Sequence, residues 1–165
     1  MGKNNDVCTR KRFDEGIGGL FQMINKHEKV LDYLRQYPES PMFFNINVYE
    51  DNNISVNTVA NENIVKEYID GTKEKQYDFA MVFINSFSAV PYSNENTEYI
   101  FNAEQFMEWI DEQEQLKNYP DFGENCFNYH ISNLQNMPAI AEQSEELTKY
   151  MFQIRITYTE QKERK

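Results

Sequence analysis

The chain has 165 residues, a length that favours one domain. Hydrophobic residues make up 40% of it and aromatic residues 15%, which is enough to build a core and excludes general disorder. The formal net charge of -11 disfavours binding to nucleic acid or anionic lipid unless basic residues cluster. They cluster at the two ends, so we expect residues 1–12 to be a disordered tail, residues 13–161 a single domain and residues 162–165 a basic tail.

A helical spacing of apolar residues begins at Phe13. These residues recur at intervals of three, four and seven positions, which places them on one face of a helix. They are Phe13, Ile17, Leu20, Phe21, Ile24, Leu31 and Leu34. Glycines weaken the first turn, and Pro38 disfavours helical geometry in the residue before it. We therefore expect a firm helix from about Leu20 that ends by Tyr37.

Two segments with alternating polarity follow a proline-containing loop. Residues 42–50 and 54–60 alternate apolar and polar side chains, as strands with one buried face do. The turn-forming sequence Asp-Asn-Asn lies between them at 51–53. The pattern predicts a β-hairpin.

Residues 64–87 predict a second, longer hairpin around Asp70-Gly71, since both central positions of a type I′ turn require positive φ. Its second strand has apolar side chains on both faces. Tyr77, Phe79, Met81 and Phe83 alternate with Ala80, Val82 and Ile84. A strand of this kind is covered on both sides, and we expect a helix on one side and assembly contacts on the other.

The tip of this hairpin, Asp70–Gln76, is charged and has no large apolar residue. Such a segment gains little by packing on its own domain, so we expect it to be mobile in the free protein and available to a partner.

The second half of the chain predicts one helix and two strands. Residues 88–100 are typical of a loop, and Asn102–Gln105 fits a capping box at the start of a helix. Residues 127–131 and 150–158 alternate as strands, with a polar loop between them. The order of elements predicts an α+β domain, in which two main helices pack on an antiparallel sheet of about six strands.

No catalytic, metal or cofactor site stands out from the sequence. His27 and His130 have no partner at metal-ligand spacing, and Cys126 is more typical of a small buried residue than of a nucleophile. Two cysteines make no disulfide framework, which favours a reducing cytoplasm. The acidic helix 104–114 is typical of a solvated face. It leaves open an alternative function as an acidic protein-binding inhibitor or DNA mimic.

Three segments give the chain a resemblance to a known family. The runs IVKEYIDGTKEKQYDFAMVF, FMEWIDEQ and KYMFQIRITYTEQ resemble those of phage and prophage minor capsid or tail-terminator (tail-completion) proteins. The resemblance covers roughly residues 20–161. Some members carry the label "chloramphenicol resistance protein", but the His-His-x-x-x-Asp-Gly motif of the acetyltransferases with that name is absent here.

The resemblance implies a non-enzymatic structural protein of the virion, made in the bacterial cytoplasm and placed at the head–tail junction. Proteins of this family form a ring, often a hexamer, that caps the tail tube, contacts connector proteins and lets DNA pass without binding it specifically. We expect assembly contacts through the hairpin and its second strand. The residues are Asp70, Gly71, Thr72, Lys73, Glu74, Lys75, Gln76, Val82 and Ile84.

Overall fold

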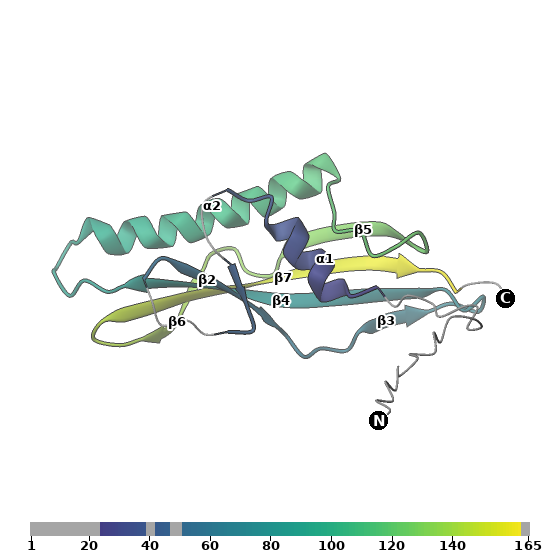
Figure 1. Cartoon of the computed structure of the whole chain (residues 1–165), viewed down its shortest axis with the longest axis horizontal. Helices are drawn as coiled ribbons and strands as arrows, with labels where there is room; N and C mark the ends of the chain where they lie inside the picture. The colour runs from purple at the N-terminus through teal and green to yellow at the C-terminus, as the bar shows by residue number, and fades with distance from the viewer. Residues whose placement is uncertain (1–23, 39–41, 47–50, 163–165) are drawn as a thin grey trace, which may run out of the picture.

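The computed structural model describes residues 24–38, 42–46 and 51–162. The predicted tail at 1–12 and the first part of the predicted helix, 13–23, lie outside these ranges. Within these ranges, two helices and seven strands form an elongated α+β structure (Figure 1). They are α1 (Lys26–Leu34), β1 (Met42–Phe44), β2 (Asn53–Thr58), β3 (Ile64–Glu67), β4 (Lys73–Ser86), α2 (Asn94–Leu116), β5 (Cys126–Asn133), β6 (Ala139–Gln143) and β7 (Leu147–Glu160).

Two long antiparallel strands form the centre of the sheet. β4 and β7 pair along their whole length, from Lys73 opposite Glu160 to Ser86 opposite Leu147. The other edge of β4 pairs with β3 and, farther along, with β2. The other edge of β7 pairs with β5 and β6. Each long strand therefore has two short strands along its outer edge.

The first predicted hairpin is wrong, because β1 pairs with β2 in parallel. The sheet is accordingly mixed and has seven strands, where we expected an antiparallel sheet of about six. β1 ends at Phe44 because Asn45 adopts a positive φ of 52°, which breaks the extended backbone. The Asn45 side chain then accepts a hydrogen bond from the Thr58 backbone N–H at 2.9 Å. The alternating pattern of 42–50 gave no sign of this departure.

The second helix begins earlier than predicted. α2 starts at Asn94 after the N-cap position Ser93, so the second part of the expected loop at 88–100 is helical. Asn96 fixes this first turn, because its side chain donates to the Ser88 carbonyl oxygen at 2.8 Å and accepts from the Ser88 N–H at 3.2 Å. β6 was also missed, because all five of its residues are exposed and show no apolar alternation.

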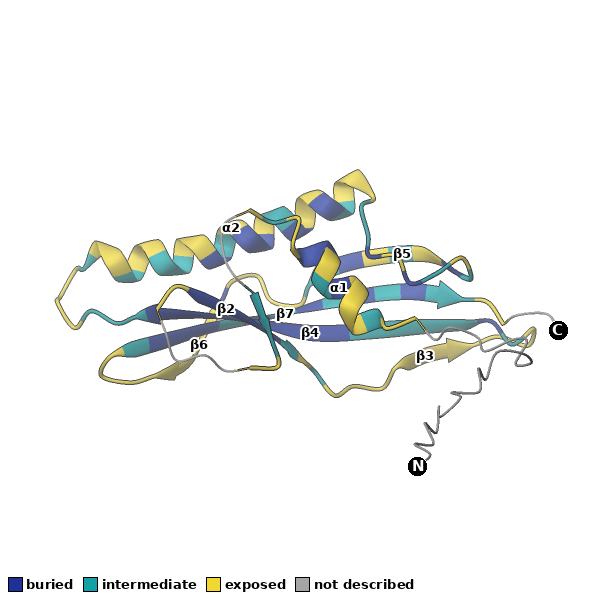
Figure 2. Cartoon of the chain, in the orientation of Figure 1, coloured by how far each residue is buried: buried dark blue, intermediate teal, exposed yellow. Residues whose placement is uncertain are grey.

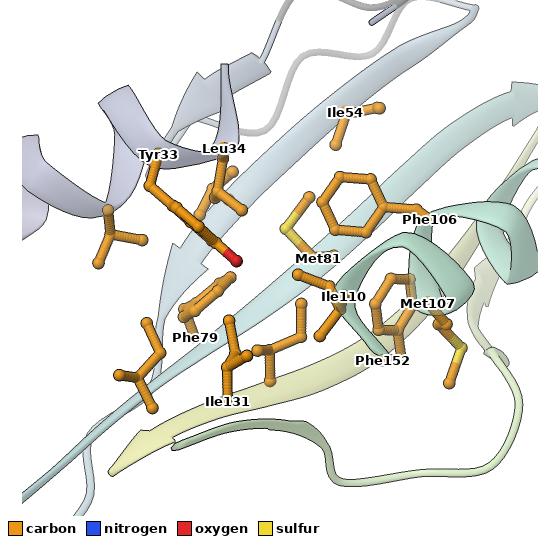
Figure 3. Packing of buried hydrophobic residues seen from close by; sticks show 14 of the residues in the cluster. Tyr33, Leu34, Ile54, Phe79, Met81, Phe106, Met107, Ile110, Ile131 and Phe152 are labelled. Atoms are coloured by element: carbon orange, nitrogen blue, oxygen red, sulfur yellow. The ribbon is translucent and has the colours of Figure 1, made fainter. Parts of the chain in front are cut away.

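Both helices cover the same face of the sheet and enclose the core (Figures 1 and 3). Phe106 of α2 lies at its centre and is fully buried. Its ring contacts those of Tyr37, Trp109, Phe83 and Phe152, with centroids 4.7 to 6.0 Å apart. The buried residues run along the middle of β4 and β7, whereas the surface of α2 that faces away from the sheet is largely exposed (Figure 2).

An ion pair joins the two central strands on the face opposite the helices. Asp78 and Arg155 are directly paired in the β4–β7 register. The Arg155 guanidinium donates to both carboxylate oxygens of Asp78, from Nε at 2.9 Å and from Nη2 at 2.7 Å. Burial raises the pKa of Asp78, but hydrogen bonds from Arg155 and Asn61 outweigh it and lower the pKa overall. The buried carboxylate therefore stays ionised beside its partner.

We predict that Phe106→Ala lowers the free energy of unfolding by about 3–5 kcal/mol, because it empties the centre of an aromatic cluster. Phe101→Ala on the same helix is the control, since Phe101 is 53% exposed and its loss should change stability little. Urea denaturation of both variants measures the difference. Equal stability losses would show that Phe106 is not central to the core.

We also predict that Arg155→Met destabilises the protein by on the order of 3 kcal/mol, because it leaves a buried carboxylate without its cation. The double variant Asp78→Asn/Arg155→Met removes both charges and should recover part of this loss. Denaturation curves for the two variants test the pair. A double variant less stable than Arg155→Met would contradict this explanation.

Candidate assembly site

β3 is an exposed edge strand. All four of its residues, Ile64–Glu67, are exposed, and among the described residues it pairs only with β4. Its outer edge therefore presents backbone groups that can accept another strand. Lys66 and Glu67 put charges on this edge, a feature that limits unselective pairing in natural sheets.

A short, hydrogen-bonded turn connects β3 and β4. The Gly71 N–H donates to the Tyr68 carbonyl oxygen at 2.9 Å, so Ile69 and Asp70 occupy the central positions. Neither has a positive φ, whereas Gly71 has a φ of 84°. The predicted type I′ turn centred on Asp70-Gly71 is therefore wrong by one position. The Asp70 carboxylate accepts from the Thr72 N–H at 2.9 Å and fixes the loop further.

This shift places an apolar side chain at the end of the hairpin. Ile69 is fully exposed, with a relative accessibility of 109%, and its neighbour Tyr68 is 41% exposed. The sequence pattern predicted a tip at Asp70–Gln76, which does not include Ile69. A type I turn centred one residue earlier, on Ile69-Asp70, would have placed Ile69 at the tip. The sequence allows this turn because glycine is also favoured at the fourth position of a type I turn.

The second half of the expected tip belongs to the sheet. Lys73–Gln76 lie in β4 and pair with β7 on one side, and Lys73–Lys75 also pair with β3 on the other. Thr72 is only 9% exposed. The expectation that this segment packs little on its own domain is wrong, because the central strand pair continues up to the turn.

The other predicted contact residues have little surface to offer. Val82 is 6% exposed and Ile84 is fully buried within the single chain. Asp70 and Gly71, by contrast, stand in the turn beside Ile69. Of the predicted contact residues, only Asp70 and Gly71 lie in the turn. We call the turn Tyr68–Gly71 together with the edge of β3 the turn surface.

Charged side chains fix the strands at the base of the turn surface. The Glu160 carboxylate forms ion pairs with Lys75 and, at 3.3 Å, with Lys26 of α1. Lys26 also donates to the Tyr158 hydroxyl at 2.8 Å. Burial raises the pKa of Glu160, but the two lysines more than compensate and lower it. The cluster connects the first residue of α1 to β4 and β7.

The residues considered for catalysis are separated in the structure. His27 of α1 shares a 2.6 Å hydrogen bond with the Tyr77 hydroxyl, and His130 of β5 contacts Glu114 instead. Cys126 is buried, and burial raises the pKa of its thiol, which makes it a weak nucleophile. Within the described ranges, no group of three or more His, Cys, Asp or Glu side chains could hold a metal ion.

Glu114 holds the end of α2 against β5. Its carboxylate accepts from Lys117 Nζ at 2.7 Å, from the Tyr119 hydroxyl at 3.0 Å and from the Ile131 N–H at 2.9 Å. His130 Nδ1 lies 3.1 Å away. Partial burial raises the pKa of Glu114, but these contacts together outweigh it and lower the pKa to about 2. The residue has a structural role.

No known family model matches the chain, and no curated protein matches it either. No helix in the described part of the chain is both long enough and apolar enough to cross a membrane.

We predict that Glu114→Gln destabilises the protein in a pH-dependent way. The folded-state pKa of about 2 lies below the ordinary value of 4.5, so the ionised carboxylate stabilises the fold above pH 4.5. This contribution is lost as the pH falls from 4.5 through 2. The stability difference between wild type and Glu114→Gln should therefore be largest near neutral pH and shrink on acidification.

Urea denaturation at a series of pH values measures this difference. Glu112→Gln is the matched control, because Glu112 is an exposed carboxylate on the same helix. A difference for Glu114→Gln that stays constant from neutral pH to about pH 3 would contradict the assigned role.

Proposed function

We propose that this protein is a non-enzymatic structural subunit of a tailed phage or prophage. In this proposal it is a tail terminator or minor capsid protein that forms a ring at the head–tail junction and caps the tail tube. It is made in the host cytoplasm and ends in the virion. The sequence resemblance gives the biological setting, and the turn surface gives a physical basis for assembly.

The observation that carries the proposal is the fully exposed Ile69 on a hydrogen-bonded turn, beside an edge of β3 that pairs with no other described strand. A large apolar side chain that is fully exposed gains nothing by packing on the described part of its own chain. It gains free energy only when a partner removes it from water. An ordered turn also loses less conformational entropy on association than a mobile one.

The charge of the chain agrees with a role beside DNA that involves no specific binding. A net charge of -11 keeps the genome from adhering to a ring through which it passes. The ring would meet the tail tube on one side and the head-completion or connector proteins on the other.

The acidic inhibitor or DNA mimic remains a second proposal, because three acids gather at one place on α2. Glu104, Glu108 and Asp111 line a shallow hollow together with Asn133 of β5. The side chain of Asn133 is hydrogen-bonded to Asp111 at 2.9 Å. A partner that binds there would be basic, and its binding would not depend on Ile69.

We predict that Ile69→Asp abolishes ring formation and incorporation into virions while it leaves the fold intact. The side chain is fully exposed, so the unfolding free energy should change by less than about 0.5 kcal/mol. Analytical ultracentrifugation and electron microscopy measure assembly, and immunogold labelling of particles locates the protein.

Leu116→Asp is the control, since Leu116 is the last residue of α2, outside the turn surface, and is 72% exposed. We expect this variant to assemble as wild type does. Virions that lack the wild-type protein would overturn the head–tail proposal. Normal particles formed with Ile69→Asp would show that the turn surface is not the assembly contact.

A further inference from the structure

A recess whose described lining residues carry no charged side chain lies at the opposite end of β4 from the turn surface. It opens between α2 and the adjoining ends of β2 and β4, and the polar side chains among these residues are five carboxamides and one tyrosine. The lining residues are Tyr37, Asn52, Asn53, Ile54, Phe83, Asn85, Asn102 and Gln105. Carboxamides with neighbouring aromatic and aliphatic side chains suit a neutral ligand with both hydrogen-bonding and apolar groups, such as a peptide turn.

Asn85 gives this recess an unmet hydrogen-bonding need. The residue is 6% exposed, and its Nδ2 donates to the Asn52 carboxamide oxygen at 3.3 Å. Its own Oδ1 is buried and has no partner among the described residues. A buried carboxamide oxygen of this kind favours a bound group that brings a donor.

The recess differs in charge from three other hollows. The described residues that line those three include glutamates, in one case together with lysines. For a chain of net charge -11, most approaches of a second copy are repulsive. Among its described lining residues, the recess has no ionised side chain that would add to this repulsion.

We propose that this recess binds the turn surface of a second copy of the same chain. The central part of the turn matches it in chemistry, with the apolar side chain of Ile69 and the Ile69 N–H, which has no acceptor among the described residues. The Asp70 carboxylate accepts a hydrogen bond from the Thr72 N–H, and the carboxamide NH2 groups on the recess can donate to its remaining acceptor sites. The recess would take up Ile69 between its aromatic side chains and supply the carboxamides to the peptide groups.

The positions of the two surfaces require contact between copies. The turn surface adjoins the first residue of β4, and Phe83 and Asn85 near the other end of this strand line the recess. β4 alone has 14 residues, which at about 3.3 Å per residue separates its ends by roughly 40 Å. No chain can place its turn in its own recess. The contact is head to tail and closes into a ring when the rotation between copies permits. This inference rests on the proposed ring, and it names the two surfaces through which neighbouring copies in that ring would touch.

Cysteine cross-linking between full-length copies tests the contact. Cys8→Ser removes one native thiol, and Cys126 is buried. In this background, tagged Ile69→Cys chains are mixed with untagged Gln105→Cys chains under mild oxidation. Gln105 is an exposed residue on the rim of the recess. We expect a disulfide-linked pair in at least about tenfold higher yield than with Leu116→Cys in place of Gln105→Cys, because docking raises the effective concentration of the thiols.

A second variant checks the recess itself. Asn102→Glu adds a negative charge to its exposed rim, opposite Asp70 of the docked turn, and should reduce the yield to that of the Leu116→Cys control. Equal yields for Gln105→Cys and Leu116→Cys overturn the contact. If wild-type rings form while residues 69 and 105 stay unlinked, the recess is wrong and the ring stands. If the pair links but virions lack the protein, the contact stands and the head–tail proposal fails.

Discussion

The pairing of β4 with β7 is the constraint on which the rest of the structure depends. Every other strand except β1 pairs with one of these two, and both helices pack on the face that they share. Side chains alternate between the two faces of the sheet, so the β4–β7 register decides which of them face the helices. A slip by one residue would turn Phe79 and Met81 away from the helices. The Asp78–Arg155 pair opposes such a slip, since its two-point contact forms only when the residues lie directly opposite.

The same pairing explains why an exposed turn can be rigid. β4 continues through Lys73–Gln76 with β7 still beside it, up to the turn. Lys26, Lys75 and Glu160 then hold this end of the ribbon to α1. The apolar apex at Ile69 is thereby preorganised, so a partner meets a formed surface and need not order a flexible arm.

Much of this architecture was predictable from the sequence because it follows from periodicity. The alternation in the segments that became β4 and β7 and the helical spacing around Phe106 gave the α+β class and the long hairpin. Features set by single backbone conformations or by contacts distant in sequence were not predictable. The positive φ of Asn45 turned an expected hairpin into a parallel pair, and the exposed β6 had no apolar pattern to mark it. The turn surface was found only in part, because the turn is centred on Ile69-Asp70, one residue before the predicted position. The recess joins residues of α2, β2 and β4, which only the tertiary fold brings together.

The topology of the central pair also sets how the chain reaches its native state. All of α2, β5 and β6 lies between β4 and β7 in the sequence, so the first stable part of the sheet needs contacts between distant segments. Proteins dominated by such contacts fold slowly, and until β7 docks, the apolar β4 has an open edge that can pair with another chain. Mutual repulsion of chains with a net charge of -11 opposes that encounter. The negative net charge thus protects the protein against aggregation before the native structure exists, while β4 waits for β7 during slow folding.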